Sequence, residues 1–400
     1  MQSDGSGDIE GGGSLPAKPA LSGGPQAPGA GMALLERITM LVAERGGSDI
    51  HMLEGERARV RLRGDLIPLE SKEHPVVTRA DIEDVLARAL TPDQRRVFEE
   101  SSDIDFSLDF PGASGRVNVG MANGRRLHLV MRYLRTDVIP IDAIGIDAAM
   151  LRALADGEGG VVIVAGETSS GKTTTIAAML DHINHTRAGS IQTIENPVEY
   201  HIPPDRCMIT RREIGRDTPD FATALRASVR KNPDVLLIGE VRDRESANIA
   251  ITAAETGIHT FCTLHAMGSV PAITRLRNMM SAGGAGDMAE FHGRLAQCLR
   301  GIVSQRLMKA TDGGIVPIFE ILNMEYTERN YLRDGDFARL EQCLESDHNV
   351  STGHCVYRLW HAEPRRIDEA MVRLVFGDRY HLMMNRLADP VTWHPLVTGL

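Results

Sequence analysis

The stretch GVVIVAGETSSGKTTTIAAML, residues 160–180, decides the fold of this chain. Its apolar run at 161–165 ends in a Gly-rich turn, which is typical of a strand that is buried on both faces. The turn GETSSGKT at 166–173 satisfies the pattern G-x-x-x-x-G-K-[ST] between this predicted strand and a predicted helix. In that context the pattern predicts a phosphate-binding loop, because backbone N–H groups and the helix dipole both favour bound negative charge.

The side chains of this loop predict a site for ATP and Mg²⁺. Lys172 is expected to reach the β and γ phosphates, Thr173 to offer a hydroxyl to Mg²⁺, and Thr174 to help hold the phosphates. The predicted nucleotide-binding residues are Gly166, Thr168, Ser169, Ser170, Gly171, Lys172, Thr173 and Thr174.

Hydrolysis also needs a group that orients and deprotonates water, and the ends of three predicted strands offer candidates. Glu195 follows the run IQTI, Glu240 comes just after VLLI, and His265 closes TFCTL, where it could sense the γ-phosphate. Parallel sheets bind ligands at this edge, so one carboxylate can organise Mg²⁺ or water while the other acts as the base. Solvated loop carboxylates and a hydrogen-bonded structural histidine are the alternatives.

Apolar runs and helical patterns alternate through the middle of the chain. Strands are expected at 161–165, 191–194, 235–238 and 260–264. A helix is expected at 219–230, where Thr218 can cap and Pro219 occupies the first turn. This alternation predicts an α/β fold with a mostly parallel sheet, here a RecA-like P-loop NTPase core.

Composition and periodicity divide the rest of the chain. The Gly- and Pro-rich start predicts a disordered tail. An apolar helical face then begins at Met32, and β-rich runs flank a helical stretch from Asp81 to Glu99. The expected organisation is a tail at 1–31, a small α+β (PAS-like) domain at 32–138, the ATPase domain at 139–325 and a C-terminal helical extension at 326–400.

The bulk composition restricts the function classes. A formal net charge of −10 disfavours a protein that coats duplex DNA, so no direct nucleic-acid partner is expected. The five cysteines are widely spaced and form no C-x-x-C pair, which fits a reducing cytosol. No apolar run reaches the roughly 18 to 20 residues that cross a bilayer, so membrane association is expected to come through partners.

Four blocks resemble the type IV pilus and type II/IV secretion ATPases. They are GETSSGKT at 166–173, TIENPVEY at 193–200, RREIGRDTPDFATALRASVRKNPDVLLIGEVRD at 211–243 and TAAETGIHTFCTLHA at 252–266. The resemblance implies that Glu195 is the general base and that Glu240 is the Walker B glutamate, expected beside Mg²⁺ with Thr173. Because no tetracysteine zinc module follows the core, the pilus retraction branch and its relatives in conjugation and effector delivery are favoured.

The resemblance also implies a homohexameric motor that works in the cytoplasm, held at the inner membrane by platform or secretion-system proteins. In this family the N-terminal domain contributes arginines to the nucleotide of an adjacent subunit. The nearest matches are Arg116, Arg132 and Arg135, and a solvated surface arginine is the alternative at each position.

Three positions depart from the family pattern. Ser169 stands where the family usually has Gly, Asn196 replaces an acidic residue, and Ile258 replaces the first histidine of its block, with His259 displaced by one residue. A positive φ at residue 169 would leave the loop backbone less relaxed with Ser than with Gly. These departures keep open a nucleotide-regulated scaffold with little turnover. A RecA-like nucleic-acid translocase also stays open, because the same sheet and phosphate loop serve such proteins.

Overall fold

The computed structural model describes residues 29–62, 65–69, 75–110, 113–134, 138–281 and 288–388. Most of the predicted tail at 1–31 lies outside these residues, and its last two positions already belong to the first helix, α1 (Ala30–Glu44). The predicted C-terminal extension is described as far as residue 388.

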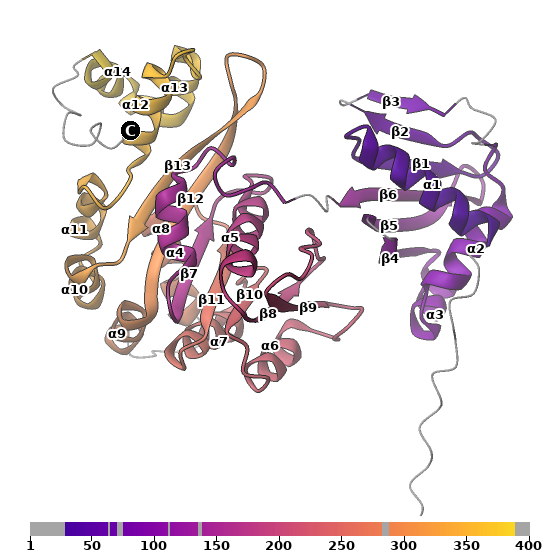
Figure 1. Cartoon of the computed structure of the whole chain (residues 1–400), viewed down its shortest axis with the longest axis horizontal. Coiled ribbons are helices and arrows are strands. Elements are labelled where there is room, and N and C mark those ends of the chain that lie inside the picture. Colours follow the sequence, from indigo (N-terminus) through magenta and orange to yellow (C-terminus); the bar gives the residue numbers. More distant parts are fainter. Residues whose placement is uncertain are drawn as a thin grey trace, which may run out of the picture.

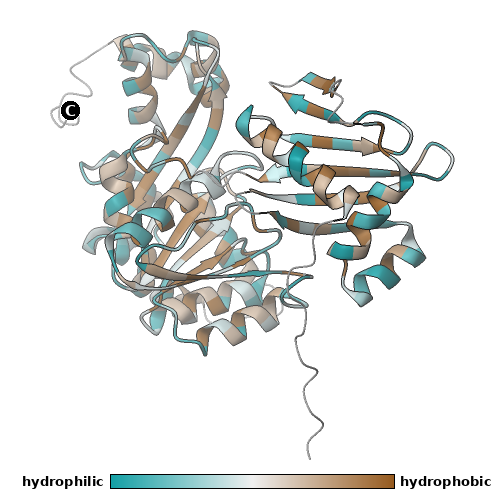
Figure 2. Cartoon of the chain, turned by 45° about the vertical axis from the view of Figure 1, so that its right-hand side comes forward, coloured by the Kyte–Doolittle hydropathy of each residue, from teal (hydrophilic) through white to brown (hydrophobic). Residues whose placement is uncertain are grey.

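The N-terminal part is built on a six-stranded antiparallel sheet with helices against one face (Figure 1). Alternate residues of its strands are buried because only one face packs against helices, and the same alternation is visible in the hydropathy colours of Figure 2. The sheet order is β3-β2-β1-β6-β5-β4. Its elements are β1 (Asp49–Leu53), β2 (Arg59–Leu62), β3 (Asp65–Pro68), β4 (Asp103–Phe110), β5 (Ala113–Ala122), β6 (Arg126–Leu134), α1, α2 (Arg79–Ala89) and α3 (Pro92–Ser101).

The second sheet has seven strands in the order β13-β12-β7-β11-β10-β8-β9. Every neighbouring pair is parallel except β12 with β13, so the predicted mostly parallel sheet is confirmed. The strand before the phosphate loop, β7, is an interior strand and lies between β12 and β11. The strands are β7 (Gly160–Ala165), β8 (Gly189–Glu195), β9 (Cys207–Glu213), β10 (Val235–Ile238), β11 (His259–Leu264), β12 (Leu299–Lys309) and β13 (Ile315–Asn323).

Helices cover both faces of this sheet (Figure 1). One face packs against α4 (Ala148–Ala155), α5 (Lys172–Thr186), α12 (Thr352–His361), α13 (Glu369–Phe376) and α14 (Tyr380–Ala388). The other packs against α6 (Phe221–Val229), α7 (Arg244–Glu255), α8 (Ser269–Ser281), α9 (Met288–Cys298), α10 (Tyr326–Asp334) and α11 (Phe337–Gln342). Among the described residues, no helix has the length and apolar content that a bilayer crossing requires.

The apolar interior is divided between the two sheets. One cluster of buried residues runs from Leu34 to Met131 and fills the N-terminal part. Two further clusters, one on each face of the seven-stranded sheet, begin at Ile141 and Val161. In the part of the chain that the structure describes, no buried apolar residue belongs to both the N-terminal cluster and either of the other two. Each sheet therefore has its own hydrophobic core.

Two predicted helices have different boundaries in the structure. The single helix expected from Asp81 to Glu99 is two helices, because Leu90 is extended and Thr91 starts α3 with a capping box. The helix expected at 219–230 begins at Phe221, and its cap is Asp220 instead of Thr218. The Asp220 carboxylate accepts a hydrogen bond from Thr223 N at 2.7 Å, which satisfies one of the free N–H groups of the first turn.

Candidate active site

A cavity of 620 Å³ lies where β7, β8, β10 and β11 end and α5 begins. This volume is in the usual range of nucleotide and cofactor sites. Seven of the eight predicted nucleotide-binding residues line it, together with Glu195, Glu240, His265 and Arg132. The eighth, Gly166, starts the turn at a point where an added Cβ would lie 2.3 Å from the Gln305 carbonyl oxygen, so the close approach of β12 requires glycine.

Lys172 opens helix α5 and its side chain turns back over the loop. The ammonium donates hydrogen bonds to the carbonyl oxygens of Gly166 at 3.0 Å and Glu167 at 2.7 Å. Burial lowers the pKa of Lys172, while the charges of Glu240 and Glu199 oppose that shift. The lysine is thus held at the base of the cavity as a charge with few water contacts, which strengthens its attraction for phosphate.

The loop backbone has a positive φ at two positions, +62° at Ser169 and +87° at Gly171. The condition under which Ser169 would leave the loop backbone less relaxed, a positive φ at this position, is therefore met. A serine in this region carries a Cβ clash that glycine lacks, worth roughly 1–2 kcal/mol. The loop holds this conformation between a buried strand and a helix N-terminus.

Replacing Ser169 with glycine is expected to stabilise the protein by about 0.5–1 kcal/mol, since relief of the clash exceeds the extra entropy of glycine in the unfolded chain. Thermal unfolding of the two proteins measures this difference. Ser170→Gly is the matched control, because the φ of Ser170 is not positive and glycine there should lower the midpoint. A lower midpoint for Ser169→Gly than for the natural chain would contradict the expectation.

Glu195 is the last residue of β8 and is buried, although it lines the cavity. Burial raises its pKa to about 7, the negative charge of Glu199 acts in the same direction, and the nearby polar groups of Thr193 and of the Glu199 backbone partly oppose the shift. A carboxyl group with this pKa can accept a proton at neutral pH and release it again.

Glu240 and His265 lie next to each other in the wall of the cavity. His265 Nε2 lies 3.4 Å from Glu240 Oε1, and Arg242 contacts the other carboxylate oxygen at 2.6 Å. Burial and the nearby Lys172 charge lower the pKa of His265, while Glu240 opposes this shift. The two predicted residues are thus brought together, with Arg242 as a further charge beside them.

His259, the displaced histidine of the fourth sequence block, lies away from the cavity. His259 begins β11, at the opposite end of the strand from His265, and its ring nitrogens lie 3.2 Å from Gly159 O and 3.0 Å from Leu154 O. Burial lowers the pKa of His259 to about 4, so the ring is neutral. His259 is a packed residue of the sheet and does not line the cavity.

The three predicted arginines differ in position. Arg132 lines the cavity and donates a hydrogen bond to Asp49 at 3.0 Å. Arg116 projects from β5, where it lies 3.6 Å from Asp105, and it does not line the cavity. Arg135 lies outside the described residues.

Several residues around the loop were not predicted from sequence. Gln305 of β12 is buried, donates to Ser170 O at 2.8 Å and accepts from Thr175 Oγ1 at 2.8 Å, so it ties the loop to helix α5. Tyr200 OH lies 2.8 Å from Thr174 Oγ1. Gln305 is 130 positions from its partner in α5, and only the pairing of β12 with β7 brings the two together.

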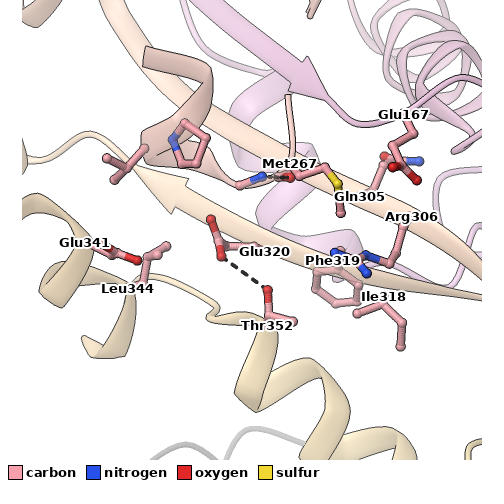
Figure 3. A pocket seen from close by; sticks show the side chains of 14 residues that line it. Glu167, Met267, Gln305, Arg306, Ile318, Phe319, Glu320, Glu341, Leu344 and Thr352 are labelled. Carbon is pink, nitrogen blue, oxygen red and sulfur yellow. Dashed lines mark hydrogen bonds between the residues drawn. The ribbon is translucent and has the colours of Figure 1, made fainter. Parts of the chain in front are cut away.

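A smaller hollow of 170 Å³ lies beside the loop, among α8, β12, β13 and α12 (Figure 3). There Glu320 accepts hydrogen bonds from Ser269 N at 2.7 Å and Thr352 Oγ1 at 3.2 Å. Gln305 lines this hollow and also donates a hydrogen bond to the loop. Glu195 and Glu240 do not line it, so this hollow lies between the surroundings of the loop and the C-terminal helices and does not extend the larger cavity.

Comparison with known proteins agrees with this geometry. The model of the family described as type II/IV secretion system protein matches residues 29–366. The type IV pilus retraction ATPase PilT of Pseudomonas aeruginosa is 36% identical over 307 residues, which cover 76% of this chain and 86% of PilT. A crystal structure of the pilus retraction motor PilT with bound ADP has a TM-score of 0.74 at 31% identity, covering 83% of this chain and 94% of that chain.

A more distant structure has the same fold. The ATPase DotB of Legionella pneumophila has a TM-score of 0.72 at 21% identity, covering 86% of this chain and 96% of that chain, and this likeness concerns the fold alone. Together these similarities confirm the predicted α/β fold class and the predicted family resemblance.

Proposed function

The chain belongs to the type II/IV secretion system protein family, and on that premise we propose that it is a ring-shaped, ATP-hydrolysing motor of a type IV pilus or secretion machine. One observation carries the proposal: a single cavity is lined by the phosphate loop with Lys172, by the buried Glu195 and by the pair Glu240 and His265. Phosphate binding, water activation and a link to the γ-phosphate then come from one site.

ATP binding uses the loop backbone and two side chains. The N–H groups at the start of α5 and the Lys172 ammonium contact the β and γ phosphates, which replace the loop carbonyls as partners of the lysine. Thr173 and Glu240 both line the cavity and offer hard oxygen donors, the type that Mg²⁺ prefers when phosphates and water complete its shell. Bound Mg²⁺ would supply positive charge that stabilises the transferring phosphoryl group.

Hydrolysis uses Glu195 as the general base. Water attacks the γ-phosphorus as its proton passes to the Glu195 carboxylate, and the bond between the γ-phosphorus and the bridging oxygen breaks to leave ADP and phosphate. The pKa of about 7 suits this role because the carboxylate is sufficiently basic and is still ionised in part at neutral pH. Glu240, held between His265 and Arg242, orients the surroundings of the γ-phosphate.

Force would come from rigid-body movement of the two separately packed parts in a homohexamer. Arg116, Arg132 and Arg135 of the N-terminal part are proposed to reach the nucleotide of an adjacent subunit and stabilise charge on its phosphates. The proposed place of action is the cytoplasmic side of the inner membrane, through platform or secretion-system proteins. The relative PilT, a type IV pilus retraction ATPase, supports a motor of this kind.

A steady-state assay tests the proposal and separates it from the alternatives. The assembled protein should hydrolyse ATP with Mg²⁺ and lose that activity when EDTA removes the metal, and mass photometry should detect a hexamer. Tight ATP binding with negligible turnover in the ring would favour a scaffold instead. Stimulation by single-stranded DNA, with steep salt dependence, would favour a nucleic-acid translocase.

A further inference from the structure

Glu213 occupies a junction between the two sheets. It is the last residue of β9, the edge strand of the seven-stranded sheet, and the parallel pairing with β8 sets it opposite Glu195. Its side chain is buried, with 7% of the residue surface exposed. Buried carboxylates are retained in folded proteins only when hydrogen-bond donors or cations satisfy them.

The two carboxylate oxygens of Glu213 have partners in different parts of the molecule. Oε1 accepts a hydrogen bond from the Ser107 hydroxyl at 2.5 Å, and Ser107 belongs to β4, the edge strand of the N-terminal sheet. Oε2 accepts from Val198 N at 3.2 Å, in the segment that follows Glu195. One buried side chain therefore contacts both the N-terminal sheet and residues 196–200 of the ATPase site.

The segment 196–200 determines the surroundings of the proposed base. Its Glu199 lines the nucleotide cavity and influences the pKa of Glu195 through both its charge and its backbone, and its Tyr200 contacts Thr174 of helix α5. The backbone next to Glu213 also contacts the proposed base, because Ile214 N donates a hydrogen bond to the backbone oxygen of Glu195 at 3.0 Å. A change at Glu213 thus reaches Glu195 through two short connections.

A second polar contact joins the two parts but does not reach the catalytic segment. Arg216 lies 3.0 Å from Asp109 of β4, and both side chains are close to half exposed. An exposed ion pair contributes little to stability, whereas loss of a donor from a buried carboxylate leaves a desolvated charge with an unmade bond. Separation of the two parts therefore costs more free energy at the Glu213 contact than at the Arg216 ion pair.

We propose that Glu213 is a positioning residue that makes ATP hydrolysis depend on contact between the N-terminal sheet and the ATPase domain. When Ser107 is in place, Glu213 is satisfied on both oxygens and fixes Val198, so Glu195 is oriented toward the water. When the N-terminal part moves away, the carboxylate loses the Ser107 donor and shifts toward water, which releases Val198 and the segment beside Glu195. This inference rests on the proposed function, since it concerns the same hydrolytic site.

Four variants of the full-length protein test the proposal by steady-state ATPase assay and ATP titration. Glu213→Met keeps the size but removes both acceptors, and kcat should fall by about tenfold or more while the ATP Kd changes less than about twofold. Glu213→Gln keeps an acceptor for Val198 N–H and an amide that can donate to Ser107, and should restore most of kcat. Ser107→Ala removes only the contact with the N-terminal sheet and should lower kcat by about threefold or more. Arg216→Gln should leave kcat unchanged.

Hydrogen exchange provides a readout that does not depend on turnover. In Ser107→Ala the amides of residues 197–200 should exchange faster than in the natural chain, and in Arg216→Gln they should not. Natural kcat in Glu213→Met, or unchanged exchange together with unchanged kcat in Ser107→Ala, would overturn the inference while leaving the proposed function intact. A natural chain without any ATPase activity would instead refute the proposed function, and this inference with it.

Discussion

Replacement of Lys172 by alanine is expected to reduce ATP hydrolysis by at least about 100-fold and to weaken ATP binding by about tenfold or more. The ammonium lies in the lining of the cavity, within hydrogen-bond distance of the loop carbonyls of Gly166 and Glu167. In this position it can contact phosphates that bind to the loop. Its removal leaves several negative oxygens without their main cationic partner. A coupled-enzyme assay and a fluorescent-nucleotide titration measure the two effects.

The folded state should tolerate this change. Burial lowers the pKa of Lys172, which means that its positive charge is less favourable in the folded chain than in the unfolded one. Lys172→Ala should therefore retain the thermal midpoint of the natural protein. Lys309→Ala, at the exposed end of β12, is the matched control and should keep full activity. Natural turnover in Lys172→Ala would exclude the phosphate loop as the hydrolytic site.

Replacement of Glu195 by glutamine is expected to lower kcat by at least about 100-fold, because an amide cannot take the proton of the attacking water. ATP binding should persist, since the loop and Lys172 are unchanged. For the natural protein, kcat should rise with pH and level off with an apparent pKa near 7, the value that burial gives Glu195. Stopped-time assays between pH 5.5 and 8.5 measure that profile, and Glu167→Gln, at an exposed loop position, should reproduce it.

The same variant should be more stable than the natural protein above pH 7. Glu195 holds its proton up to about pH 7 when folded and only to about 4.5 when unfolded. Between these values the folded state binds more protons, so its stability falls as pH rises, by at most about 3 kcal/mol in total. Glutamine carries no charge and avoids this loss. Equal unfolding midpoints for the two proteins at both pH 4 and pH 8 would show that Glu195 is not buried as described.

The phosphate loop and both carboxylates could be predicted from sequence because their signals are local. A Gly-rich turn of this pattern between a strand and a helix commonly binds phosphate, and glutamates at the ends of parallel strands lie at the same edge of the sheet. The boundaries of β10 at 235–238 were predicted without error, since four apolar residues lie between polar neighbours. The strained backbone at Ser169 was also foreseeable, because the family places glycine there.

The supporting residues could not be predicted because their partners are distant in sequence. Gln305 contacts the loop residue Ser170 across 135 positions, and Glu213 contacts Ser107 across 106 positions. A buried glutamine or glutamate has no recognisable pattern without the sheet order that places it. The N-terminal cap of α6 was predicted wrongly for a different reason. Thr218 and Asp220 are both good capping residues, and the path of the chain before α6 places the aspartate at the cap position.

The separate hydrophobic cores of the two sheets have a mechanical consequence. Within the described ranges no buried apolar residue belongs to both cores, so the two bodies can rotate past one another without opening apolar packing. The polar contacts between them include the Ser107–Glu213 hydrogen bond and the Arg216–Asp109 ion pair, which can break and re-form. Polar groups that separate can be satisfied by water, so opening such a joint costs less free energy than opening an apolar core. In the proposed motor, most of the free energy of each ATP would then remain available to move the load.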